Sequence, residues 1–172
     1  MASTSVELFK LAMTMLASDD RVLFIGQSVA FPGTAMYETL SHIPASRRIE
    51  FPVAEDLHVG ACVGLSLVNF VPVCIVPRCD FLMRAMDQLV LHLDKLEKMS
   101  DGQFSPKVII RTRVGSKWPL NAGPQHTNDF SEAFRLMLTN IDVMRISHKD
   151  DIIPTYRQAL ESRRSSLVIE VL

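Results

Sequence analysis

Hydrophobic residues recur along the chain with two different periods, and the two periods alternate from one end to the other. Short runs rich in β-branched residues are apolar at almost every position, as in Val-Pro-Val-Cys-Ile-Val at 71–76. Continuous apolar runs of this length are typical of strands that are covered on both faces. Runs of this kind predict strands at 21–25, 48–51, 71–76, 107–112, 141–146 and 167–171.

Between the predicted strands, apolar residues return at every third or fourth position, which is the spacing of an amphipathic helix. This spacing predicts helices from residue 4 to about residue 16 and at 54–68, 82–96, 129–138 and 152–162. Two of the apolar helix faces are explicit, Leu82, Met86, Leu89, Leu93 and Leu96 in one helix and Leu57, Ala61, Leu65 and Val68 in another.

Polar residues at two predicted helix starts support these boundaries. Thr4 and Glu7 have the spacing of a capping box, in which a hydroxyl and a carboxylate three residues later each bind the other's backbone N–H group. Glu132 stands at the corresponding position of the helix predicted at 129–138. We therefore expect capping boxes at the starts of both helices.

The alternation of strands and helices predicts an α/β fold, because parallel strands need crossover connections about as long as a helix. We expect a three-layer, doubly wound and mainly parallel sheet with helices on both faces, forming a single domain over residues 1–172. The one long irregular stretch is 112–128, which contains Gly115 and Gly123. Ligands of parallel sheets bind where strands end, so this loop is the first place to expect chemistry.

The composition is that of a globular chain, and it excludes several classes of function. Of the 172 residues, 48% are hydrophobic and 22% are charged, which excludes general disorder. The formal net charge of −1 argues against a dedicated nucleic-acid-binding protein, which usually carries a basic excess. The longest apolar run, at 69–77, is much shorter than the about 18 residues that a membrane span needs.

The cysteines and the first residues indicate a cytoplasmic protein. Cys62, Cys74 and Cys79 make an odd count without a C-x-x-C pair, so neither a disulfide framework nor a cysteine zinc site is expected. We expect three reduced and mostly buried thiols. The first ten residues lack the basic segment and the continuous apolar core of a signal peptide.

Several common site motifs are missing or incomplete. Gly33 follows Gly26 too late for the G-x-G-x-x-G pattern of dinucleotide-binding folds. Glu55 and His58 have the spacing of half of a di-iron carboxylate site, which needs a second copy on a four-helix bundle. We expect no metal ligands in this chain.

Five segments, taken in order, resemble one known family. The segment F-P-V-A-E at 51–55 is similar to that family's T-P-I-A-E signature, and A-G-P-Q-H-T at 122–127 is similar to its A-G-x-Q-H-S segment. The other three are the first strand with its glycine turn at 21–26, the start of a helix at 79–88, and M-S-D-G-Q at 99–103. By these segments the chain resembles the pyrimidine-binding domain of the transketolase-type thiamine diphosphate enzymes. It resembles in particular the N-terminal domain of the beta subunit of the pyruvate and branched-chain 2-oxo acid dehydrogenase decarboxylating components.

The resemblance implies roles for four residues. Glu55 matches a glutamate that donates a hydrogen bond to N1′ of the cofactor's aminopyrimidine and so favours the imino tautomer, whose N4′ removes the thiazolium C2 proton. Burial would let such a glutamate hold a proton near neutral pH. Phe81 matches an aromatic residue that stacks on the pyrimidine, and His126 matches a histidine that lines the substrate channel and helps to protonate intermediates. Gln27, directly after the first strand, is expected to contact the cofactor as well.

Three of these residues also have a plainer interpretation, which the sequence leaves open. Glu55 could be an ordinary first-turn glutamate that the helix dipole stabilises. Phe81 could belong to the core at the start of the helix at 82–96. His126 could be a solvated loop histidine.

The chain departs from the family pattern in three places. Gln and Ser at 27–28 stand where the family has two acidic residues, so a charge near the cofactor cleft is lost. Asp56 and His58 stand where small or apolar residues are usual. Arg78 and Cys79 replace a Phe-Ala pair.

The loop before His126 is a further departure, since it is usually rich in glycine. Here it contains Arg113, Lys117 and Trp118. We expect Arg113 and Lys117 to be candidates for binding an unusual anionic substrate. A solvated loop face, or contacts with a partner, are the alternatives.

The resemblance also implies that the cofactor is shared with a second polypeptide. In the family, the diphosphate of thiamine diphosphate and its Mg²⁺ are held by another domain with a Gly-Asp-Gly…Asn motif, and this sequence contains no such motif. The related beta subunits also continue into a C-terminal domain, for which 172 residues leave no room. We therefore expect a split enzyme in which this chain pairs with an alpha-type subunit as an α₂β₂ heterotetramer.

Two functions are compatible with these features. The first is catalytic, as the pyrimidine-binding, beta-like subunit of an enzyme that decarboxylates a 2-oxo acid or transfers the resulting acyl or ketol unit. The second is a non-catalytic module that pairs with and regulates an active homologue. The joint presence of Glu55, Phe81 and His126 favours the first function. The changes at Gln27, Asp56 and Arg113 keep the second open.

Overall fold

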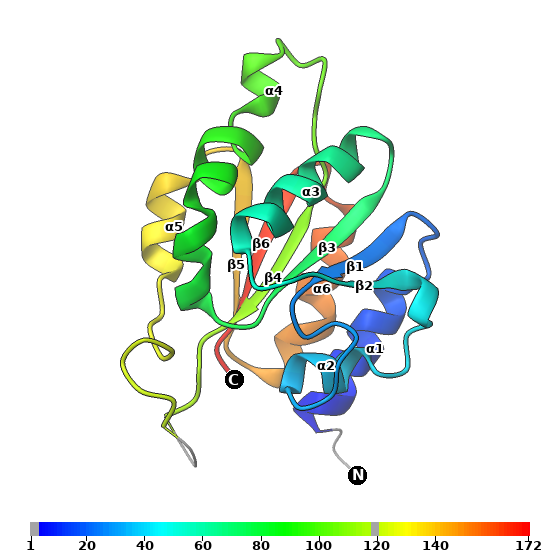
Figure 1. The fold of residues 1–172 in the computed structure, drawn as a ribbon, viewed down its shortest axis with the longest axis vertical. Coiled ribbons are helices and arrows are strands. Elements are labelled where there is room, and N and C mark those ends of the chain that lie inside the picture. The colour runs from blue at the N-terminus through cyan, green and yellow to red at the C-terminus, as the bar shows by residue number, and fades with distance from the viewer. Residues whose placement is uncertain (1–3, 118–120) are drawn as a thin grey trace.

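Parallel strands form one sheet in the order β2-β1-β3-β4-β6-β5 (Figure 1). The computed structural model describes residues 4–117 and 121–172. All predicted strands are confirmed, with boundaries that differ by at most two residues. The strands are β1 (Val22–Gly26), β2 (Arg48–Glu50), β3 (Val71–Val76), β4 (Ile109–Arg113), β5 (Ile141–Ile146) and β6 (Ser165–Glu170).

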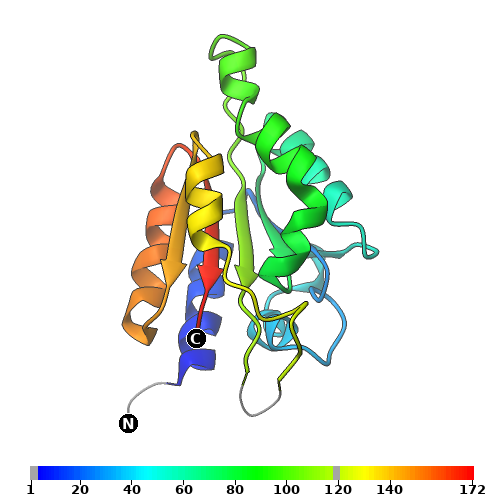
Figure 2. The ribbon, with the colours of Figure 1, turned by 90° about the vertical axis from the view of Figure 1, so that its left-hand side faces the viewer.

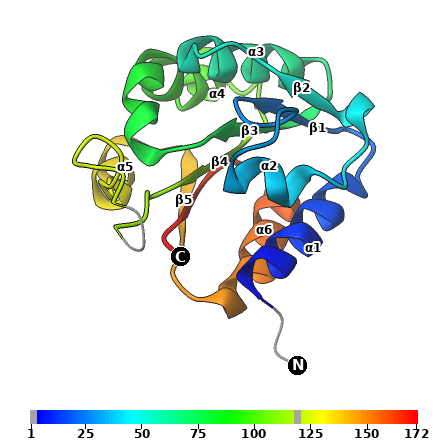
Figure 3. The ribbon, with the colours of Figure 1, turned by 60° about the horizontal axis from the view of Figure 1, so that its bottom comes forward.

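Helices cover both faces of the sheet, which confirms the predicted three-layer fold (Figures 2 and 3). Helices α1, α2 and α6 pack on one face, and α3, α5 and the segment 79–93 pack on the other. The α-helices are α1 (Ser5–Ala17), α2 (Ala35–Leu40), α3 (Glu55–Leu67), α4 (Leu96–Met99), α5 (Ser131–Met137) and α6 (Ile152–Glu161). The sequence does not predict α2, because six residues are too few to show a helical period.

The single helix predicted at 82–96 is wrong in its details. The segment is a 3₁₀ helix at Cys79–Ala85, then a π-helix at Asp87–Leu93, then the short α4. Leu82, Leu89 and Leu93 are nevertheless buried, as the pattern predicts. Spacings of three and four residues do not distinguish one α-helix from a tight turn followed by a wide one.

The predicted inward face of α3 is also wrong. Leu57 and Val68 are 50% and 65% exposed. The buried face of α3 carries Val59 and Cys62 together with the polar residues Glu55 and His58. Because two polar residues lie on the inward face, hydrophobic spacing alone selected the wrong side of the helix.

The two predicted capping boxes have different outcomes. At α1 both bonds form, because Thr4 N–H donates to the Glu7 carboxylate at 2.7 Å and Glu7 N–H donates to the Thr4 hydroxyl at 3.3 Å. At α5 the prediction is wrong. Asp129 instead accepts the N–H of Ser131 at 3.0 Å, and the Glu132 side chain pairs with an arginine one turn later.

The core lies in two clusters, one on each face of the sheet, and β3 and β6 are buried at every position. The three cysteines are free and buried, as predicted. Burial raises the pKa of the Cys79 thiol to about 11, so it stays protonated at neutral pH. Within the described residues, no helix is both long enough and apolar enough to cross a membrane.

A buried ion pair joins β4 to β6. Arg111 Nε donates to Glu170 Oε1 at 2.7 Å, and Arg111 Nη1 donates to the hydroxyl of Thr39 in α2 at 2.8 Å. The Tyr156 hydroxyl in α6 donates to the same Glu170 oxygen at 2.6 Å. Burial opposes the charge of Arg111, but Glu170 outweighs it and holds the pKa of the guanidinium above its usual value. The network therefore fastens α2 and α6 to the sheet.

Removing one member of this buried pair should strongly lower the stability of the fold. Arg111→Met is expected to lower the free energy of unfolding by about 3–5 kcal/mol, because the Glu170 carboxylate stays buried without its partner. The control is Arg135→Met, which breaks an exposed pair with Glu132 and should cost less than about 1 kcal/mol. Urea unfolding followed by circular dichroism measures both. Similar, small losses in the two variants would contradict a stabilising role for the buried pair.

Candidate functional site

The carboxyl ends of the parallel strands meet at one edge of the sheet. Strand order reverses there between β1 and β3, and open α/β sheets bind ligands at such points. A cavity of about 320 Å³ lies at this position, and we call it the switch-point cavity. Its lining residues are Gln27, Ser28, Gly33, Thr34, Ala35, Met36, Pro77, Arg78, Phe81, Arg113 and His126.

Four residues that the sequence singles out line this cavity together. They are Gln27 after β1, Phe81 after β3, Arg113 at the end of β4, and His126 in the loop before α5. These positions are far apart along the chain, so the fold brings them to one place. The cavity is therefore the candidate active site.

Gln27 is positioned by a close approach between β1 and β3. Gly26 has a φ of +133°, and a Cβ at this residue would lie 2.2 Å from the carbonyl oxygen of Ile75, so the position requires glycine. The Gln27 N–H donates to that same oxygen at 3.2 Å. Gln27 Oε1 is buried and accepts no hydrogen bond from the described residues. It is therefore available to a donor on a ligand.

Glu50, at the end of β2, holds the loop that follows Gln27. Its carboxylate accepts the backbone N–H groups of Ser28, Val29 and Ala30 at 2.7, 2.6 and 2.7 Å. Converging N–H groups of this kind form an anion-binding concavity, which the protein's own carboxylate occupies here. The sequence does not reveal this role, because the contact depends on the pairing of β1 with β2.

Phe81 and His126 form one wall of the cavity. Their ring centroids lie 5.4 Å apart at an interplanar angle of 84°, an edge-to-face contact. His126 Nδ1 lies 3.0 Å from the carbonyl oxygen of Ala122. The His126 loop passes directly beside Gly115, where a Cβ would lie only 1.9 Å from the His126 carbonyl oxygen. The absence of a side chain at Gly115 therefore allows the two loops to touch.

Two arginines form another part of the cavity wall. Arg78 Nη1 donates to the carbonyl oxygen of Pro77 at 3.0 Å, and Arg113 Nη2 donates to the backbone oxygen of Leu172 at 3.2 Å. Burial and the nearby charge of Arg113 lower the pKa of Arg78. The sequence marks Arg78 as a departure from the family but not as a site residue. Its position directly after a central strand was the available signal.

Glu55 does not line the switch-point cavity. It begins α3 and is 1% exposed, and its Oε2 lies 3.3 Å from Arg84 Nε without a hydrogen bond. Arg84 belongs to the same 3₁₀ helix as Phe81 and lies three residues after it. Side chains with this separation eclipse in a 3₁₀ helix, so Phe81, which lines the cavity, and Arg84, which contacts Glu55, lie on the same side of that helix.

The remaining predicted loop residue does not join the cavity. Lys117 is exposed and is not among the lining residues, while Trp118 lies outside the described residues. His58 is buried, and its Nε2 lies 2.7 Å from the carbonyl oxygen of Pro52. Across residues 4–117 and 121–172, no group of three or more His, Cys, Asp or Glu side chains is arranged to hold a metal ion.

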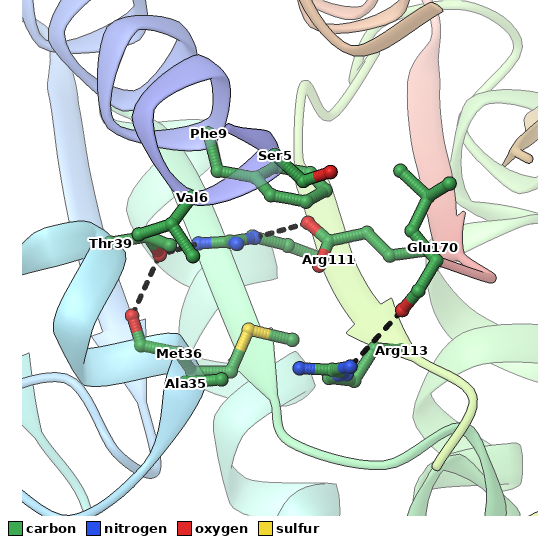
Figure 4. Close-up of a pocket in the computed structure, with 10 residues that line it drawn as sticks. Ser5, Val6, Phe9, Ala35, Met36, Thr39, Arg111, Arg113 and Glu170 are labelled. Carbon is green, nitrogen blue, oxygen red and sulfur yellow. Dashed lines mark hydrogen bonds and ion pairs between the residues drawn. The ribbon is translucent and has the colours of Figure 1, made fainter. Parts of the chain in front are cut away.

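A second cavity, of about 190 Å³, lies beside the first, between α1, α2 and the ends of β4 and β6 (Figure 4). It contains the Arg111–Glu170 pair, whose guanidinium also lies 5.3 Å from the ring centroid of Phe9. Ala35, Met36 and Arg113 line both cavities. The start of α2 and the end of β4 therefore separate the two spaces.

Comparison with known proteins identifies the family. The family described as "Transketolase, pyrimidine binding domain" matches residues 3–171. The chain therefore belongs to the transketolase pyrimidine-binding domain family. A solved structure titled "Split gene transketolase, inactive beta4 tetramer" has the same fold, with a TM-score of 0.73 at 16% identity over 96% of this chain and 50% of that chain.

Curated relatives include beta subunits of 2-oxo acid dehydrogenases. The 3-methyl-2-oxobutanoate dehydrogenase subunit beta of Mycobacterium tuberculosis is 30% identical over 148 residues, which are 84% of this chain and 42% of the relative. The pyruvate dehydrogenase E1 component subunit beta of Leifsonia xyli subsp. xyli is 26% identical over 86% of this chain and 44% of that protein. The chain thus spans less than half the length of these relatives.

The residues of the cavity fit the aminopyrimidine of thiamine diphosphate. Phe81 offers an aromatic surface, and the unpartnered Gln27 Oε1 offers an acceptor for an amino group. Glu55, which lies outside the cavity lining, is buried, and the exposed Arg84 is its one ion-pair partner in the described part of the chain. The arrangement can hold a flat heterocycle that carries both donors and acceptors.

The contact between Gly115 and the His126 loop generates a test of the site's architecture. Gly115→Ala should lower stability by about 1–3 kcal/mol, because the new Cβ pushes the His126 loop away. Gly64→Ala is the matched control, since Gly64 lies in α3 with nothing within 4 Å of its Cβ position. It should raise stability by about 0.5–1 kcal/mol through helix propensity. Thermal unfolding measures both changes, and a Gly115 variant as stable as the wild type would contradict the contact.

Proposed function

We propose that this chain is the pyrimidine-binding, beta-like part of a thiamine diphosphate-dependent enzyme. Its reaction is the decarboxylation of a 2-oxo acid or the transfer of the resulting acyl or ketol unit. The observation that carries the proposal is the switch-point cavity, where Gln27, Phe81 and His126 come together in a domain of the transketolase pyrimidine-binding family. The curated relatives named as 2-oxo acid dehydrogenase beta subunits support this reaction class.

Bound thiamine diphosphate supplies a carbon nucleophile for the carbonyl carbon of the substrate. Phe81 supports one face of the pyrimidine, and Gln27 Oε1 accepts a hydrogen bond from its amino group. The protonated carboxyl of Glu55 would donate a hydrogen bond to a ring nitrogen. This last role requires Arg84 to leave the ion pair, and its 71% exposed side chain is free to turn into solvent.

His126 is suited to moving a proton at the substrate. The carbonyl oxygen of Ala122 accepts a hydrogen bond but does not donate one, so the 3.0 Å contact favours a hydrogen on Nδ1. Nε2 is then the nitrogen that can take up a proton. A histidine changes its charge near neutral pH, which suits it to general acid and base catalysis.

The proposed enzyme includes an alpha-type partner that carries a Gly-Asp-Gly…Asn motif and holds the diphosphate and Mg²⁺, in an α₂β₂ heterotetramer. The relatives' designation as beta subunits supports such pairing. Val53 and Leu57, on either side of Glu55 in the chain, are 67% and 50% exposed. Exposed apolar residues beside a site suit a protein contact. Three free, buried cysteines suit a cytoplasmic location.

The function is tested by reconstitution. The chain is co-expressed with its candidate alpha-type partner, supplied with thiamine diphosphate and Mg²⁺, and assayed for CO₂ release from a panel of 2-oxo acids. Glu55→Ala should lower kcat by about 10²–10⁴-fold, the usual contribution of a positioned acid or base. Asp56→Asn is the control, because Asp56 is the exposed neighbour of Glu55 in the same helical turn and should leave turnover unchanged.

The same experiment separates the catalytic function from a regulatory one. If the Glu55→Ala variant turns over as fast as the wild type, Glu55 is not the proton donor. A complex that turns over equally well with this chain and with its Glu55 variant, but loses activity without the chain, would support the non-catalytic module.

A further inference from the structure

Two arginines that line the switch-point cavity form no ion pair with an acidic side chain of the described residues. Their positive charge indicates that the cavity binds an anionic group of a ligand. We propose that Arg78 and Arg113 bind an anionic group of the substrate that is separate from the reacting carbonyl carbon and keeps its charge throughout the reaction. The inference rests on the proposed function and narrows its substrate class. The substrate is then a 2-oxo acid or ketose that carries a second carboxylate or a phosphate.

The charge of the cavity wall is the first support. Arg78 and Arg113 are the charged side chains among the described lining residues, and neither forms an ion pair within residues 4–117 and 121–172. Residues 1–3 and 118–120 contain no Asp or Glu. Asp80 is near enough to favour the charge of Arg78, but in the described structure it forms no ion pair with it and does not line the cavity. Its Oδ1 accepts a hydrogen bond from Asn128, and its Oδ2 has no hydrogen-bond partner in the described chain. The wall thus carries two positive charges without a neutralising side chain on it.

Arg111, on the same strand as Arg113, has a structural role and offers a comparison. It lies two positions before Arg113 on β4, so both side chains lie on the same face of the sheet. The protein supplies Arg111 with the Glu170 carboxylate and the Thr39 hydroxyl. Arg113 Nε, in contrast, is buried without a hydrogen-bond partner in the described chain. Arg113 Nη2 donates to the backbone oxygen of Leu172, so the missing partner is that of Nε. Because buried polar groups are normally hydrogen-bonded, we expect a ligand to supply it.

The packing around Arg78 leaves its guanidinium accessible. A Cβ at Gly115 would lie 3.3 Å from Arg78 Nε, so glycine at this position leaves room for the arginine beside the His126 loop. Its one hydrogen bond in the described chain joins Nη1 to the neighbouring carbonyl oxygen of Pro77. The remaining N–H groups form the planar fork that binds carboxylate and phosphate oxygens in pairs.

The chemistry of decarboxylation decides which anionic group the arginines serve. The carboxylate that leaves as CO₂ loses its charge as the bond breaks. Two arginines bound to that carboxylate would stabilise the substrate more than the transition state and would slow the reaction. A group that keeps its charge is bound equally in both states, so an arginine pair can hold it without this penalty. We therefore expect Arg78 and Arg113 to bind a second anionic group of the substrate, which takes no part in the reaction.

Direct binding tests the site without any turnover. The full chain is titrated by calorimetry with inorganic phosphate and, separately, with succinate, and the stronger of the two identifies the kind of anion. Arg78→Phe, which carries the aromatic residue usual in the family, should weaken that binding by about tenfold to a hundredfold. Arg78→Lys keeps the charge without the fork and should give an intermediate affinity. Arg157→Gln removes an exposed charge on α6 and is the matched control.

Selectivity in the reconstituted enzyme is the second readout. The ratio of kcat/KM for 2-oxoglutarate to that for pyruvate, or for xylulose 5-phosphate to xylulose, should fall at least tenfold in Arg78→Phe, while the affinity for thiamine diphosphate should not change. Equal anion binding by the wild type and Arg78→Phe would overturn the inference. A loss of thiamine diphosphate affinity in that variant would also overturn it, because the arginine would then serve the cofactor. Absence of turnover with every substrate would refute the proposed function, while the calorimetry still decides the anion site.

Discussion

The ion pair between Arg111 and Glu170 is the interaction on which the arrangement of both cavities depends. It connects β4 to β6, where the order of strands reverses a second time, and Thr39 and Tyr156 attach α2 and α6 to it. Because α2 is held against the sheet in this way, its first residues form the wall that the two cavities share. A charged pair outside the switch-point cavity thus holds one wall of the candidate active site in place.

The walls of the switch-point cavity are held mainly by the backbone. The N–H of Gln27 binds the carbonyl oxygen of Ile75 where Gly26 allows β1 to approach β3, and Gly115 allows the end of β4 to touch the His126 loop. Three backbone N–H groups bind Glu50 in the loop after β1. Such supports fix the backbone of the cavity walls before a ligand binds, which is the property that a preorganised active site requires.

Much of the fold could be predicted because the signals are local. Apolar runs identify the strands, and alternation with helices identifies the layers. Hydrophobic spacing failed where the inward face is polar, as at Glu55 and His58 in α3, and where helical turns tighten and widen, as after Cys79. The family's motifs identified Phe81 and His126, which both line the cavity, but a motif describes what relatives share. Arg78 differs from the relatives, so the motifs did not identify it, and its position directly after a central strand was the one signal for its place in the cavity wall.

The 3₁₀ helix at Cys79–Ala85 has a mechanical consequence. Three residues complete each of its turns, so Phe81 and Arg84 project from the same side of the helix. A rotation of this helix would move both side chains, whereas a change of rotamer moves the 71% exposed side chain of Arg84 alone. The Glu55 carboxyl can therefore be uncovered by the Arg84 side chain alone, while Phe81 keeps its edge-to-face contact with His126.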